Sequence, residues 1–120
     1  MLLTVVHESS ELLVINKPAG LVCHPTKGDC YSSLISRVRL HLGESCEPHL
    51  INRLDRETSG VVLVAKSAPV ALDLRRLWES REVCKSYLAI VHGHLAADSG
   101  KVCAPLGKDE PCRHEPTPPR

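Results

Sequence analysis

Short apolar runs separated by polar breaks open the chain and predict paired strands. Residues 1–8 and 11–17 are rich in β-branched residues and are separated by Ser9 and Ser10, which is typical of two strands or a hairpin. Residues 17–29, KPAGLVCHPTKGD, interrupt this pattern with prolines and glycines and predict a loop. The beginning of the chain therefore indicates two strands followed by an irregular connection.

Helical spacing appears twice further along. Residues 32–43 begin with serine, end with Gly43 and place apolar residues on one helical face, at Leu34, Ile35, Val38 and Leu42. Residues 68–82 show the same period at Val70, Ala71, Leu74 and Leu77, with basic residues on the outer side. Both segments predict helices that pack through their apolar faces.

Two further segments predict strands. Residues 60–66, GVVLVAK, form a continuous apolar run that is typical of a strand buried on both faces. Residues 83–95, VCKSYLAIVHGHL, predict another strand that contains Tyr87, and residues 101–107 form a short last element. The order of elements indicates the α+β class, with helices packed on a mixed, mostly antiparallel sheet.

The end of the chain and its composition narrow the picture. Residues 1–108 are expected to form the domain, and the proline-rich residues 109–120 a disordered tail.

Lys and Arg number 15 against 14 Asp and Glu, so net charge gives no argument for nucleic acid. The six cysteines form no C-x-x-C pair, so we expect no metal site, and no P-loop or GxGxxG occurs to support a phosphate-cradling nucleotide site. Without a cleavable signal or an apolar run of about 20 residues, we expect a soluble, cytoplasmic protein with reduced thiols and no membrane contact.

The candidate chemistry is concentrated in residues 51–60, INRLDRETSG. Asp55 stands between Arg53 and Arg56, directly before the most apolar strand, where we expect it at the mouth of the core. Nearby cations favour the ionised form of an aspartate, which suits a nucleophile or a base, and the arginines are suited to hold a phosphate backbone. The alternative is a surface turn whose charges pair weakly.

This stretch resembles the signature of the RNA pseudouridine synthases of the RluA type, a run close to HRLDxxTSGxxxxAK. Residues 52–66 read NRLDRETSGVVLVAK, and only Asn52 departs, standing where histidine is usual. Three weaker matches occur in the family's order: VINKPAGLVCHPT resembles its NKPxGxxxHP segment, VCKSYLAIVHG its strand with a K-x-Y motif, and APLG the start of a later element. The resemblance covers about residues 11–108.

The resemblance implies isomerisation of uridine to pseudouridine in rRNA or tRNA, without a cofactor or metal. Asp55 falls at the family's catalytic aspartate and Tyr87 at its active-site tyrosine, which stacks on the target base; a strand tyrosine half-buried in the core is the alternative. Arg53 matches an arginine beside the flipped-out nucleotide. The remaining candidates for RNA contacts are Arg56, Lys17, Lys85 and His24. A solvated surface position is the alternative for the lysines, and a satisfied loop histidine the alternative for His24.

One part of the family pattern is missing. The family's RxHQIR-like segment, whose arginine pairs with the catalytic aspartate, does not occur here, so we expect a partial pseudouridine synthase catalytic fold. Without the remaining strands, the sheet is expected to keep an open edge that invites self-association. The alternative function is a truncated, catalytically inactive fragment with at most weak RNA binding.

Overall fold

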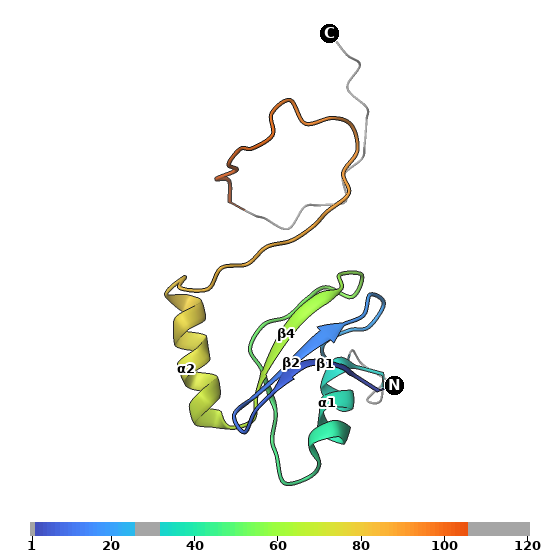
Figure 1. Ribbon diagram of the computed structural model, residues 1–120, viewed down its shortest axis with the longest axis vertical. Coiled ribbons are helices and arrows are strands. Elements are labelled where there is room, and N and C mark those ends of the chain that lie inside the picture. The colour runs from blue at the N-terminus through green and yellow to red at the C-terminus, as the bar shows by residue number, and fades with distance from the viewer. Residues whose placement is uncertain (1, 26–31, 106–120) are drawn as a thin grey trace. The chain divides into compact units, whose positions relative to one another are not determined.

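The computed structural model describes residues 2–25 and 32–105 (Figure 1). Its contacts divide the chain into two units, Met1–Ser86 and Tyr87–Arg120. All regular secondary structure of the described residues lies in the first unit. The two units are therefore described separately, and the expected tail of residues 109–120 lies outside the described residues.

A four-stranded antiparallel sheet forms the centre of the first unit. Its strands are β1 (Thr4–Glu8), β2 (Leu12–Lys17), β3 (His49–Leu50) and β4 (Gly60–Ala65), in the order β1-β2-β4-β3. β2 pairs with β4 over its whole length, from Leu12 opposite Ala65 to Lys17 opposite Gly60. The expected α+β class, with helices on a mostly antiparallel sheet, is confirmed.

Helix α1 (Leu34–Leu42) begins and ends where local signals predict. The Ser33 hydroxyl accepts a hydrogen bond from the Ser36 backbone N–H at 3.4 Å, which satisfies an amide that has no partner within the helix. Gly43 ends the helix, and its N–H donates to the carbonyl of Arg39 at 2.9 Å. The predicted apolar face is confirmed, because Leu34, Ile35 and Val38 are buried and Leu42 packs against the same core.

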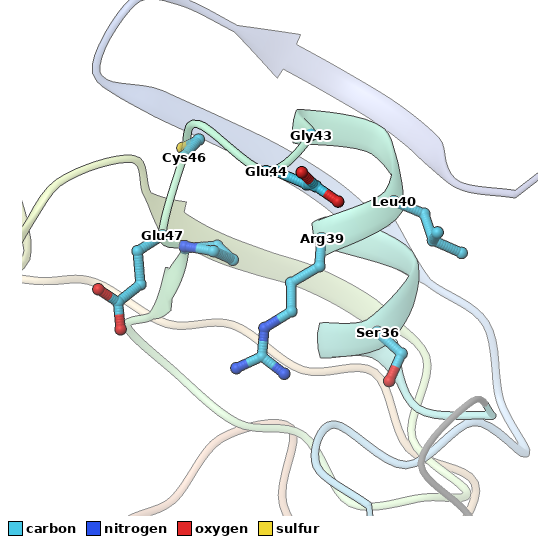
Figure 2. Close-up of a pocket in the computed structure, with 8 residues that line it drawn as sticks. Ser36, Arg39, Leu40, Gly43, Glu44, Cys46 and Glu47 are labelled. Carbon is cyan, nitrogen blue, oxygen red and sulfur yellow. The ribbon is translucent and has the colours of Figure 1, made fainter.

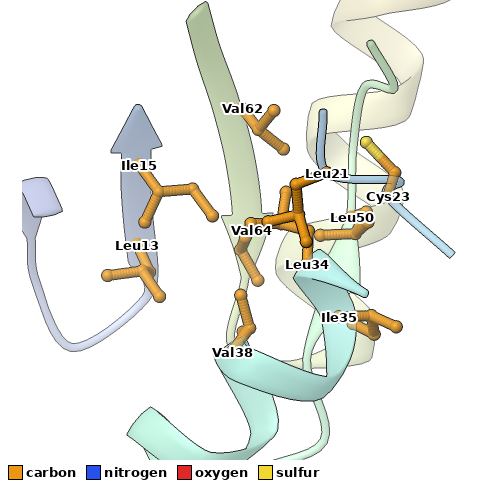
Figure 3. Packing of buried hydrophobic residues seen from close by; sticks show 10 residues of the cluster. All are labelled: Leu13, Ile15, Leu21, Cys23, Leu34, Ile35, Val38, Leu50, Val62 and Val64. Carbon is orange, nitrogen blue, oxygen red and sulfur yellow. The ribbon is translucent and has the colours of Figure 1, made fainter. Parts of the chain in front are cut away.

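The core lies between α1 and one face of the sheet (Figure 3). Leu13 and Ile15 of β2 alternate with residues that point to the other face, as do Val62 and Val64 of β4. The rest of this cluster comes from α1, β3 and the segment after β2: Leu21, Cys23, Leu34, Ile35, Val38 and Leu50. Because the chain has no Phe, small aliphatic side chains fill this core.

Helix α2 (Ala68–Glu79) contacts β4 and β3 but is covered less completely. Of its predicted apolar face only Ala71 is buried, and Leu77 is exposed. The expectation that residues 60–66 form a strand buried on both faces is wrong, since Val61 is 56% exposed. The reason is that α1 seals one face of the sheet, whereas the other face is covered only in part. Neither helix of the described residues combines the length and apolar character that a membrane crossing requires.

The predicted strand at residues 83–95 does not form. These residues have no regular structure, and Leu88 and Ile90 are fully exposed. A strand is stable only when its N–H and C=O groups pair with a neighbouring strand, and none of the described residues pairs with this segment. Of the short element expected at 101–107, residues 101–105 are also irregular, and the last two lie outside the described residues.

An ionic cluster joins three elements at the Ala65 end of β4. Lys66 Nζ lies 2.8 Å from Glu8 Oε1 and 2.6 Å from the carbonyl oxygen of Ser9, and His41 Nε2 lies 3.0 Å from Glu8 Oε2. The hydrogen bonds from Lys66 and then His41 hold the pKa of Glu8 below its ordinary value of 4.5. The cluster thereby ties β1 to the end of α1 and to the residue after β4.

Replacing Glu8 tests this cluster. Glu8→Gln is expected to lower the free energy of unfolding at neutral pH, measured by urea denaturation. Because the folded pKa lies below the unfolded one, this stabilisation is present above about pH 4.5 and is lost as the pH falls through the folded pKa. The wild-type and variant curves should therefore converge in acid. Glu11→Gln should leave the curve unchanged, because the Glu11 side chain forms no hydrogen bond or ion pair with the described residues.

A matched pair on α1 tests the core. Leu34→Ala removes a fully buried side chain and is expected to cost about 2 to 5 kcal/mol of unfolding free energy. Leu40→Ala, on the same helix but 70% exposed, should change it by no more than about 0.5 kcal/mol. Equal losses in urea denaturation would contradict the packing described for α1.

Candidate functional site

Asp55 lies on the turn between β3 and β4. The Thr58 N–H donates to the Asp55 carbonyl oxygen at 3.1 Å and closes the turn, while the side chains of Arg53, Asp55 and Arg56 are exposed. Arg56 Nε lies 3.8 Å from the carboxylate of Glu57, and Asp55 forms no ion pair with any described residue. The carboxylate is therefore open to a ligand and not occupied by the flanking arginines.

Asn52 fixes the chain that enters this turn. Its side-chain oxygen accepts from the Leu63 N–H at 2.8 Å, and its amide nitrogen donates to the Val61 carbonyl at 3.0 Å. The Ile51 N–H also donates to the Leu63 carbonyl at 2.9 Å. Because an amide side chain offers one donor group and one acceptor, Asn52 continues the pairing with β4 beyond the two residues of β3.

The segment after β2 holds the turn on both sides of Asp55. Before it, the Cys23 thiol donates to the Leu54 carbonyl at 3.4 Å and accepts from the Leu54 N–H at 3.5 Å. After it, the Arg56 carbonyl accepts from the Gly20 N–H at 2.7 Å and from Lys17 Nζ at 3.1 Å. The residues on either side of the aspartate are thus bonded to the segment that carries the NKPAG motif.

Lys17 does not occupy the surface position expected of a phosphate contact. Its side chain has no exposed area, and Nζ donates to the carbonyls of Pro18 at 2.9 Å, Leu21 at 2.7 Å and Arg56 at 3.1 Å. These three acceptors use all three N–H groups of the ammonium. In this structure Lys17 joins the segment after β2 to the turn that carries Asp55, and its buried ammonium is not accessible to RNA.

Positive charge gathers near His24. Partial burial, followed by the nearby charges of Arg53 and Arg39, holds the pKa of His24 below its ordinary value of 6.5. His24 and Arg53 were expected at the site from the sequence, whereas Arg39 of α1 was missed. The only signal for Arg39 is a basic residue on the exposed side of a predicted helix, and helical period does not say which other loop that side approaches.

An open cavity of about 840 Å³ lies beside the C-terminal half of α1 (Figure 2). Its lining comes from that helix and the connection to β3: Ser36, Arg39, Leu40, Gly43, Glu44, Cys46, Glu47 and Pro48. Of the residues near His24 it includes Arg39, and it includes none of the residues expected from the sequence. Asp55 was expected at the mouth of the hydrophobic core, and this cavity is a different site because Asp55 does not line it.

Lys85 and Tyr87 lie at the boundary of the two units. Lys85 Nζ is 5.0 Å from the centre of the Trp78 ring, so the lysine stacks on the last turn of α2. Tyr87 is the first residue of the second unit and is 66% exposed. The role of Tyr87 as the active-site tyrosine that stacks on the target base stays a prediction.

The described residues contain no cluster of three or more His, Cys, Asp or Glu side chains placed to share a metal ion. The four described cysteines are free: Cys23 is buried, Cys46 donates to the Lys66 carbonyl at 3.4 Å, and Cys84 and Cys103 are exposed.

The charge around His24 can be tested by titration. Arg53→Gln and Arg39→Gln should each raise the pKa of His24, because each removes a positive charge that opposes protonation. The pKa of His24 is lower in the folded protein than in the unfolded chain, so at a pH between the two values the unfolded chain binds more protons. The free energy of unfolding therefore falls as the pH drops from the unfolded pKa to the folded one. Arg53→Gln and Arg39→Gln should each reduce this loss of stability.

Proton NMR of the imidazole ring measures the midpoint directly. Arg37→Gln is the matched control, since Arg37 is also on α1 but donates to the Leu2 carbonyl at 3.5 Å and does not affect His24. A His24 midpoint that is the same in all four proteins would show that Arg53 and Arg39 are not its neighbours.

Comparisons with known proteins agree with the motif. A family model described as RNA pseudouridylate synthase matches residues 11–118. The chain is 43% identical over 105 residues to the dual-specificity RNA pseudouridine synthase RluA of Pasteurella multocida, covering 87% of this chain and 47% of that protein. It is 38% identical over 109 residues to the ribosomal large subunit pseudouridine synthase D of Nitrosomonas europaea, covering 88% and 31%.

A third relative and a solved structure complete the comparison. The uncharacterized RNA pseudouridine synthase YlyB of Bacillus subtilis is 32% identical over 121 residues, covering 96% of this chain and 40% of the relative. The structure of human RNA pseudouridylate synthase domain containing 4 matches with a TM-score of 0.53 and 33% identity, covering 66% of this chain and 30% of that one. The chain thus spans less than half the length of these relatives. It belongs to the RNA pseudouridylate synthase family, and its sheet and helices are part of that family's fold.

Proposed function

We propose that this chain carries the aspartate-bearing part of an RNA pseudouridine synthase and that Asp55 is its catalytic residue. The observation that supports this most strongly is the placement of Asp55 within the family signature: its carboxylate is exposed, while the residues before and after it are bonded to buried groups. A reaction at a nucleotide requires an accessible carboxylate on a backbone that is held in place.

The chemistry rearranges one nucleotide without oxidation or reduction. The bond between the ribose anomeric carbon and the ring nitrogen breaks, the uracil turns, and a carbon–carbon bond forms from the ring's fifth carbon. That carbon releases its proton, and the freed ring nitrogen carries a proton in the product. Asp55 acts as a nucleophile on the ribose or the ring, or as a base in an elimination. These alternatives share the need for a carboxylate beside an extruded base.

The charges near His24 suit the RNA backbone. Arg53 and Arg39 lie close enough to His24 for their positive charges to lower its pKa, and Arg56 is exposed on the same turn as Arg53. Guanidinium groups bind phosphate with charge-assisted hydrogen bonds. The proposed partner is rRNA or tRNA, in line with the ribosomal and dual-specificity names of two relatives, and the proposed location is the cytoplasm.

A second function is favoured by a different observation. Residues 83–93, where the family's tyrosine strand is expected, pair with no strand among the described residues, and Leu88 and Ile90 are fully exposed. A chain whose tyrosine segment remains unpaired lacks an ordered surface on which the base can stack. The alternative is therefore an inactive fragment that binds RNA weakly, and exposed apolar residues of this kind also favour self-association.

Release of tritium from RNA labelled at the fifth carbon of uridine tests both functions. For an active chain, Asp55→Ala and Asp55→Asn are expected to reduce release by several orders of magnitude, because the loss falls on the chemical step, while the RNA dissociation constant stays nearly the same. Glu57→Gln is the matched control, since it removes an exposed carboxylate from the same turn.

The outcomes separate the two functions. Release that is lost in both Asp55 variants and kept in Glu57→Gln supports the synthase. Equal release from all four proteins would exclude Asp55 as the catalyst. No release from any of them, together with weak RNA binding, would support the inactive fragment.

A further inference from the structure

We infer that Lys17 and Cys23 are positioning residues for Asp55: they hold the backbone of the residues before and after it, so that buried contacts set the direction in which its side chain leaves the backbone. This inference rests on the proposed function of Asp55. Neither residue touches a substrate in this arrangement, because both are buried.

Lys17 holds the side after the aspartate. Its ammonium bonds the Arg56 carbonyl, 39 residues away in sequence, and the carbonyls of Pro18 and Leu21 in its own loop. A buried cation is expensive unless each donor is satisfied, and this one has three donors and three acceptors. The ammonium therefore favours a single relative position of the loop and the turn.

Cys23 holds the side before the aspartate. Its sulfur both donates to the carbonyl and accepts from the N–H of Leu54, so the two contacts hold the peptide groups on both sides of this one residue. The Cys23 carbonyl also accepts from the Ile35 N–H at 3.1 Å, which connects the same residue to the first turn of α1. Each sulfur contact is weak, but burial and the helix keep the thiol in place.

The two attachments leave a single residue between them. Leu54 is held by Cys23 and Arg56 by Lys17 and Gly20, so the backbone of Asp55 cannot rotate without breaking one set of bonds. Misplacing a catalytic group by about 1 Å can cost on the order of 100-fold in rate. The bonds from Lys17 and Cys23 go to backbone atoms. They therefore orient the backbone of Asp55 and leave its carboxylate free.

Hydrogen exchange in the whole chain, followed by NMR, tests the attachment without requiring activity. In Lys17→Met, exchange of the Gly20 and Thr58 amides should rise by on the order of tenfold, as expected for losing a hydrogen bond from a charged donor. Exchange of Val62 and Val64 in β4 should stay within about twofold. Lys66→Met is the matched control, because Lys66 also bonds a backbone carbonyl but at the other end of β4.

Cys23→Val provides a second variant that keeps the site apolar and of similar size. It should raise exchange of the Leu54 amide and leave Gly20 unchanged, so it decides the inference if Lys17→Met does not fold. Unchanged exchange at Leu54, Gly20 and Thr58, or an equal rise throughout β4, would overturn positioning and leave these residues with a general role in stability.

Tritium release by the same proteins separates this inference from the proposed function. Positioning predicts that kcat falls by on the order of tenfold or more in Lys17→Met and less in Cys23→Val, with the RNA dissociation constant within about twofold. If the unaltered chain releases tritium and a loosened Lys17→Met turn releases it equally fast, the positioning inference fails while the function stands. If no protein releases tritium, the proposed function fails, and the exchange data still decide whether Lys17 and Cys23 hold the turn.

Discussion

A lysine side chain with no exposed surface must find an acceptor for each of its N–H groups, or the fold loses the free energy of solvating a cation. Lys17 meets this condition with three backbone carbonyls, two from its own loop and one from the turn of Asp55. The constraint is strict because the carbonyls come from segments that β2 and β4 bring together. The contacts of Lys17 therefore link the pairing of these strands to the placement of the aspartate.

The two faces of the sheet are covered to different degrees. On one face α1 and the segment after β2 enclose an aliphatic core, and the same segment supplies the groups that hold the turn. On the other face α2 buries little beyond Ala71, and Val61 remains exposed. The side of the sheet that supports Asp55 is thus complete within the first unit, whereas the opposite side offers apolar surface for further structure.

Local signals in the sequence were sufficient to predict those elements whose structure depends on residues close by in the chain. Helix α1 was predicted to its caps, because Ser33 and Gly43 act within one turn of the helix ends. The prediction of a strand at residues 83–95 was wrong, because a strand-like sequence pattern does not supply the partner strand that a strand needs. The burial of Lys17 could not be predicted either, since its acceptor on Arg56 is 39 positions away. For the site, the motif located Asp55, but neither Arg39 nor the contacts of Cys23 leave a pattern in the sequence.

The signature itself combines structural and chemical residues. Asn52 completes the pairing with β4 through its amide, and Lys66 joins the ionic cluster at the far end of the strand. Gly60 has a φ of 137°, which side chains rarely allow, and this conformation starts β4 directly after the turn. The side chain of Asp55 has no such structural role, because it forms no hydrogen bond or ion pair with any described residue. A long ordered run in which the surrounding residues build the support and one carboxylate is left free is a stronger argument for chemistry at Asp55 than the flanking arginines alone.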